Sequence, residues 1–140
     1  MAADGGGPSH NDLKRVSRDD GRLDLTGAPE GFDALVMADV ARSRGGLTVF
    51  IARDGARANA FMEAMGFFAP EIEVLQLPSW DCLPYDRVGP SAAVAAHRMA
   101  TLTRLARGLD PKQPTLLVTA APAALQRMPP REVVARAGYT

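Results

Sequence analysis

The segment from Gly27 to Ala34 has the length and leading glycine of a phosphate-binding loop, G-x-x-x-x-G-K-[ST]. In such a loop a lysine reaches the β- and γ-phosphates, and the hydroxyl after it holds Mg²⁺. Here Phe32 replaces the second glycine, Asp33 replaces the lysine and Ala34 replaces the hydroxyl residue. The spacing of a nucleotide site is therefore present without the side chains that perform its chemistry.

Reversing the charge at Asp33 has a large electrostatic effect. Two unit charges about 4 Å apart interact by roughly 4 kcal/mol at an effective dielectric constant near 20, so the sign change alters that interaction by about twice as much. We therefore predict that this loop binds no ATP and that the chain carries no cofactor. A chance spacing in a glycine-containing turn is the alternative interpretation, and it predicts the same absence of nucleotide chemistry.

A second group of reactive side chains lies between two prolines, in the segment from Leu77 to Asp86. Proline fixes its own φ and pushes the preceding residue toward extended geometry, so this segment is a stiff, non-helical loop. Trp80 and Tyr85 have the types that stack on nucleic-acid bases, although packing the loop onto a sheet is the more common use. Asp81 and Asp86 are either paired carboxylates or acceptors for backbone amides in a turn.

Other catalytic and metal-binding chemistry has little support. Cys82 is the one cysteine, and nothing in the sequence places His97 beside it as a base, so we interpret it as a partly buried apolar thiol. One cysteine and two histidines do not make a zinc site. The single thiol and the lack of an 18-residue apolar run predict a cytoplasmic protein without membrane contact.

Composition and periodicity predict one domain that positions these residues. The chain has 140 residues, 46% of them hydrophobic, and sixteen basic residues balance sixteen acidic ones, which does not favour a strongly electrostatic nucleic-acid binder. We expect a disordered or loosely ordered leader over 1–20, an α/β domain over 21–128, and the start of a following domain, truncated, over 129–140. Strands are predicted at 22–26, 47–52, 72–77 and 115–119.

Helices are predicted between these strands. Apolar spacing places them at 32–44 and 55–68, then from a cap at Ser91 to a stop at Gly108, then at 121–127, and one more turn opens at Pro129-Pro130. The alternation favours a parallel sheet with helices on both faces. The continuous apolar run at 47–52 predicts a strand buried on both faces.

Several motifs in this order resemble the bacterial transcription-repair coupling factor family (Mfd). The matching stretch runs from Leu25 to Pro130, and its most specific part is Trp80-Asp81-Cys82-Leu83-Pro84-Tyr85-Asp86. The other matches are Leu25-Thr26-Gly27, Pro90-Ser91, Arg98 with Thr101-Leu102, Val118-Thr119, Ala124-Leu125-Gln126-Arg127 and Pro129-Pro130. The candidate interaction residues are thus Trp80, Asp81, Leu83, Pro84, Tyr85, Asp86 and Arg98.

The resemblance implies a fold and a role. The N-terminal module of that family is similar to domain 1a of UvrB, a helicase- or RecA-like domain, and has a degenerate phosphate loop, which fits Gly27 to Ala34. It implies a non-catalytic scaffold for recruiting UvrA, with autoinhibitory packing against the other domains as a further expectation. RNA polymerase, double-stranded DNA and ATP with Mg²⁺ would be bound by the full-length protein. An active ATPase-like domain and a free-standing single-stranded DNA-binding module are the two alternatives.

Overall fold

The computed structural model describes residues 21–22, 24–27, 29, 31–82 and 89–137. The expected leader over 1–20 lies outside these residues. The described elements follow in the order α2 (Phe32–Arg44), β1 (Leu47–Ala52), α3 (Gly55–Phe68), β2 (Glu73–Leu77), α4 (Ala92–Ala106), β3 (Thr115–Ala120), α5 (Ala121–Ala124) and α6 (Arg131–Ala137). The predicted alternation of strands and helices is confirmed from residue 32 onward.

The three described strands form one parallel sheet in the order β1-β3-β2. Thr115 at the start of β3 lies opposite Leu47 of β1 on one side and Glu73 of β2 on the other. The Thr119 hydroxyl also donates a hydrogen bond to the Leu77 carbonyl at 2.9 Å. The strand that comes last in the sequence is therefore the central one.

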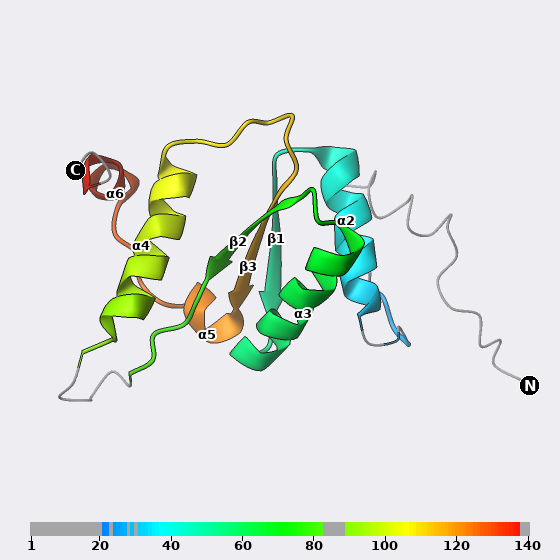
Figure 1. The fold of residues 1–140 in the computed structure, drawn as a ribbon, viewed down its shortest axis with the longest axis horizontal. Coiled ribbons are helices and arrows are strands. Elements are labelled where there is room, and N and C mark those ends of the chain that lie inside the picture. The colour runs from blue at the N-terminus through cyan, green and yellow to red at the C-terminus, as the bar shows by residue number, and fades with distance from the viewer. Residues whose placement is uncertain (1–20, 23, 28, 30, 83–88, 138–140) are drawn as a thin grey trace, which may run out of the picture.

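Helices α2 and α3 pack together against one face of the sheet and form the main core (Figure 1). Phe61 of α3 is fully buried, and its ring stacks on Phe50 of β1 with centroids 3.6 Å apart and planes 8° from parallel. Small side chains on α2 let it approach closely: Ala34, Ala38 and Ala41 are all fully buried. The close packing of α2 and α3 on the sheet thus fixes the positions of the strands, including their carboxyl ends.

Helix α4 lies on the other side of the sheet, against β2 (Figure 1). The Ser91 hydroxyl caps it by accepting from the Val94 amide at 3.3 Å, and Gly108, with φ 89°, follows its end. The Thr101 hydroxyl donates to the Gln76 carbonyl of β2 at 2.6 Å. The predicted cap and stop of this helix are both confirmed.

The prediction that β1 is buried on both faces is wrong. Leu47, Val49 and Ile51 are 46%, 46% and 57% exposed, whereas Ala52 is buried and Phe50 half-buried. The reason is the strand order, because β1 is at the edge of the sheet and α2 and α3 cover only the face that carries Phe50. A continuous apolar run is therefore not proof of burial on both sides.

The predicted strand at 22–26 is not present among its described residues. Arg22 and the segment from Asp24 to Thr26 are exposed and take part in no strand. Alternating residues form a strand only when a neighbouring strand provides hydrogen-bond partners, and the described part of the chain offers none to this segment. The other predicted strands and helices agree with the structure within a few residues at their ends.

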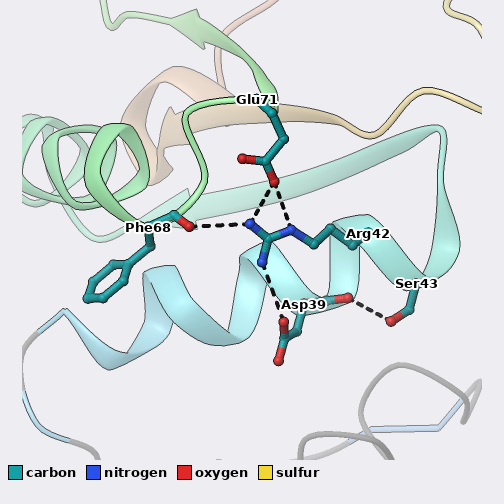
Figure 2. Close-up of polar contacts among 5 residues, drawn as sticks. All are labelled: Asp39, Arg42, Ser43, Phe68 and Glu71. Carbon is teal, nitrogen blue, oxygen red and sulfur yellow. Dashed lines mark hydrogen bonds and ion pairs between the residues drawn. The ribbon is translucent and has the colours of Figure 1, made fainter.

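A polar cluster fastens α2 to the end of α3 (Figure 2). Arg42 donates two hydrogen bonds to one carboxylate oxygen of Glu71, at 2.8 and 2.6 Å, and a third to the Phe68 carbonyl at 3.2 Å. Asp39, one turn earlier on α2, lies 3.6 Å from the same guanidinium. The cluster therefore links two helices and the start of the segment leading to β2.

We expect the Glu71 carboxylate to stabilise the fold only above acidic pH. Its own backbone amide, and then Arg42, hold the pKa of Glu71 below its ordinary value near 4.5. A lowered folded-state pKa gives stability that is present above the unfolded-state pKa and is lost as pH falls through the folded-state value. Thermal unfolding at pH 7 should show Glu71→Gln melting a few degrees at most below wild type, and the difference should vanish near pH 3.

Glu63 provides the control for this measurement because it is exposed on α3 and has the same carboxyl chemistry. Glu63→Gln should leave the melting temperature unchanged across the same pH range. A gap between wild type and Glu71→Gln that stays constant down to pH 3 would show that charge at Glu71 is not the cause.

Candidate functional site

Ligands of parallel α/β proteins bind at the carboxyl ends of the strands, and both candidate regions lie there. The first is an open hollow of about 520 Å³ at the end of β1. The first turns of α2 and α3 contribute to its lining, which consists of Pro29, Asp33, Phe50, Ile51, Ala52, Arg53 and Arg57. The loop with phosphate-loop spacing therefore borders a real concavity.

Asp33 is not free in this hollow. One carboxylate oxygen accepts a hydrogen bond from the Arg57 guanidinium of α3, and the other accepts from the Ala34 amide at 3.0 Å. The side chains of Asp33 and Arg57 are 30% and 25% exposed, so water screens the pair only partly. The acidic residue at the lysine position of the phosphate-loop spacing is thus held in an internal ion pair.

The backbone of the same turn is also engaged. The Phe32 amide donates to the Pro29 carbonyl at 3.1 Å, and the Ala34 amide to the Gly31 carbonyl at 3.1 Å. Gly31 caps α2 with φ 83°, a left-handed conformation that glycine adopts without strain. Gly27 is exposed and has φ 73°. These internal hydrogen bonds leave fewer amides for an anion than a phosphate loop offers.

Asp54 lies next to Arg53, one of the residues that line this hollow. Its carboxylate caps α3 by accepting from the Arg57 amide at 2.8 Å, and it also contacts the Arg53 guanidinium at 3.1 Å. The Arg57 amide is the main reason that the pKa of Asp54 is lowered, and Arg53 adds to it. Asp33 and Asp54 therefore each have a guanidinium and a backbone amide as partners within the chain.

The second candidate region is the start of the proline-bounded loop after β2. Arg98 of α4 is 2% exposed, donates to the Pro78 carbonyl, and places its guanidinium 4.5 Å from the centre of the Trp80 ring. Burial lowers the pKa of Arg98. Asp81 accepts from the Ser91 amide at 3.0 Å, and hydrogen bonds from Ser91 lower its pKa. The start of the loop is thereby held against α4 at two points, by Arg98 within the helix and by Ser91 at its cap.

The remaining loop candidates, Leu83, Pro84, Tyr85 and Asp86, lie outside the described residues. The stacking role of Tyr85 and the pairing of Asp81 with Asp86 therefore stay predictions. Cys82 is half-buried and His97 is exposed. Within the described ranges no group of three or more histidine, cysteine, aspartate or glutamate side chains could hold a metal, and no helix there could cross a lipid bilayer.

Three residues in these regions were not predicted as site residues. Arg57 stands 24 positions after Asp33, and no local spacing connects them. The Gln76 side-chain amide donates a hydrogen bond to the Asn59 side-chain oxygen at 3.1 Å, and both residues border a smaller hollow beside Trp80. No local pattern in the sequence predicts this pair. A cap at Asp54, three residues before Arg57, is the one local signal that could have placed Arg57 in the first turn of a helix.

No protein-family model matches this chain. About half of it is similar to curated transcription-repair-coupling factors: it is 35% identical over 66 residues to that of Rickettsia prowazekii (strain Madrid E) and 31% identical over 70 residues to that of Rickettsia bellii (strain RML369-C). These matches cover 47% and 50% of this chain, and the chain spans only about 6% of the length of each relative. The predicted resemblance is thereby confirmed for about half the chain.

Proposed function

We propose that this chain is a non-catalytic module of a transcription-repair-coupling factor, which supports the recruitment of UvrA to damaged DNA at stalled RNA polymerase. Similarity over about half the chain supports the link to this protein class. In this proposal the fold is a UvrB-like relative of a nucleotide-binding domain whose phosphate loop has lost its function. The ion pair of Asp33 and Arg57 is the single observation that carries the non-catalytic part.

The argument from this ion pair is electrostatic and steric. A bound triphosphate would bring about four negative charges to a turn where Asp33 is already negative and Arg57 already neutralised. Freeing Arg57 for phosphate would leave the Asp33 carboxylate partly buried without its counter-charge, which is costly. The site therefore favours its own internal pair over an anionic ligand.

We expect calorimetric titration with Mg·ATP to give no saturable binding to the wild-type chain. Asp33→Ala removes the acidic side chain but restores neither the second glycine nor the hydroxyl of a phosphate loop, so it should also fail to bind. Saturable micromolar binding by the wild-type chain would contradict the proposal. If Asp33→Ala kept that binding unchanged, the electrostatic argument would be wrong as well.

The recruiting role concerns the complete protein. In that protein, UvrA and the other domains would be the partners of this module, RNA polymerase and double-stranded DNA would bind elsewhere, and ATP with Mg²⁺ would serve a separate motor. The proposed setting is the cytoplasm. An autoinhibitory contact between this module and the other domains is part of the same proposal.

Purified UvrA tests the scaffold role directly. Immobilised complete protein should retain UvrA, whereas the 140-residue chain alone should retain it much more weakly, because the surface that contacts UvrA is proposed to follow this module. Equal retention by the two would move the contact surface into residues 1–140. No retention by the complete protein would refute the recruiting role while leaving the nucleotide argument intact.

A further inference from the structure

Within the described part of the chain, the edge strand β1 has an unpaired backbone edge and an uncovered apolar face. Its outer edge pairs with no strand among the described residues, and one of its faces exposes Leu47, Val49 and Ile51. Sheet edges in soluble proteins are commonly guarded by charged residues, proline or bulges, yet the sequence of β1, Leu-Thr-Val-Phe-Ile-Ala, contains no charge and no proline. An unguarded edge beside an apolar face indicates a surface that is covered in the complete protein.

The register shows which side of the sheet is open. Ile51 lies opposite Thr119, and Thr119 opposite Leu77, so these three side chains share one face. Leu77 is only 2% exposed, because α4 packs on this face over β2. The α4 side is thus covered at β2 and uncovered at β1, where α5 provides only one short turn beside the strand end.

The handedness of the connections predicts what completes this side. A strand–helix–strand connection between parallel strands is right-handed in about 98% of cases. Helix α3 connects β1 to β2 on one face, and α4 connects β2 back to β3 on the other. A connection from β3 to a new strand outside β1 would cross the sheet in the same direction as the connection from β2 to β3 through α4. Its helix would therefore lie on the α4 side, over Leu47, Val49 and Ile51.

We propose that one helix–strand unit, supplied by polypeptide beyond residue 140, docks on β1. Its strand pairs in parallel with the free edge, and its helix places an apolar stripe on Leu47, Val49 and Ile51. The curated relatives have ample polypeptide for such a unit, since this chain spans about 6% of their length. A single unit accounts for both open features of β1.

The segment at 22–26 is consistent with this arrangement. Helix α2 packs on the same face as α3, so if 22–26 formed a parallel strand of this sheet, a right-handed connection through α2 would place it beyond the outer edge of β1. Its described residues, Arg22 and 24–26, are exposed and in no strand. An inserted strand between it and β1 would provide the partner that it lacks.

A second copy of this chain fits β1 less well. Two copies related by a twofold axis would pair their β1 edges in antiparallel fashion. The side chains of Leu47, Val49 and Ile51 from both copies would then line one larger uncovered face. Such a dimer would pair the backbone groups of the β1 edge, but it would leave the apolar face exposed and make it larger.

Hydrogen exchange tests the proposal without any substitution. In the 140-residue chain, the outward-facing amides of β1 should exchange rapidly, and light scattering should give a monomer. In the complete polypeptide translated from its gene, the exchange rates of the same amides should be at least about tenfold lower. A dimer of the 140-residue chain with protected β1 amides would overturn the proposal, as would equal exchange in the two proteins or a reading frame that stops at residue 140.

The variant Val49→Lys tests the helix half of the unit. In the 140-residue chain its urea midpoint should match that of wild type, as should that of Val133→Lys, a control at a position 56% exposed on α6. In the complete polypeptide Val49→Lys should lower the midpoint clearly, because the lysine would lie beneath a helix. A midpoint unchanged in the complete polypeptide would show that no helix covers β1.

Discussion

Phe61→Ala is expected to lower the free energy of unfolding by about 3–5 kcal/mol, the range measured for such truncations in protein cores. Phe61 is fully buried, stacks on Phe50 and lies in the cluster that joins α2, α3 and the sheet. The variant loses the buried area of the ring, leaves a cavity and removes the stacking partner of an edge strand. Domains of this size have about 5–15 kcal/mol in total, so the expected loss is a large part of the stability of the fold.

Phe67 provides the matched control, because it lies on the same helix and is 81% exposed. Phe67→Ala should change the free energy of unfolding by no more than about 0.5 kcal/mol. Urea denaturation followed by circular dichroism measures both variants. Equal effects of the two substitutions would mean that α3 does not present Phe61 to the sheet.

Arg98→Ala is expected to destabilise the chain by about 2–4 kcal/mol and to change the emission of Trp80. The substitution leaves the Pro78 carbonyl without its donor, which costs about 1–3 kcal/mol, and removes a cation–π contact worth roughly 0.5–2 kcal/mol. The cost of burying the charge, visible in the lowered pKa of Arg98, offsets part of this loss. Trp80 is the one tryptophan, so the emission reports on the surroundings of this ring.

Arg98→Met separates packing from charge, since it keeps an apolar stem beside the ring and removes the donor. It should recover part of the stability lost in Arg98→Ala while its Trp80 emission stays different from that of wild type. Wild-type emission and an unchanged urea midpoint in Arg98→Ala would show that the guanidinium does not anchor the loop.

Local signals in the sequence predict the elements well. The cap at Ser91, the stop at Gly108 and the apolar spacing on α2 and α3 each depend on residues within one or two turns, and the structure agrees with them. The strand at 115–119 is likewise predicted from its β-branched and apolar run, and it occupies the buried central position where such a run belongs.

Features that depend on strand order are not predictable in the same way. Leu47–Ala52 and Thr115–Ala120 are both continuous apolar runs, yet the first is an edge strand and the second is central. The pairing of Asp33 with Arg57 and the burial of Arg98 over Trp80 also join residues that are distant in the sequence. The aspartate at position 33, where a phosphate loop would have lysine, can be read from the sequence alone, but its ion pair with Arg57 is visible only in the fold.

The central position of β3 has a consequence for synthesis on the ribosome. Neither β1 nor β2 has a partner in the sheet until β3 leaves the exit tunnel, and about 70 residues separate the ends of β1 and β3. At about 5–20 residues per second, translation leaves the apolar β1 segment unpaired for on the order of 3–14 s. During that interval we expect the nascent chain to be accessible to chaperones that bind extended apolar segments, and slow codons before β3 would prolong its exposure.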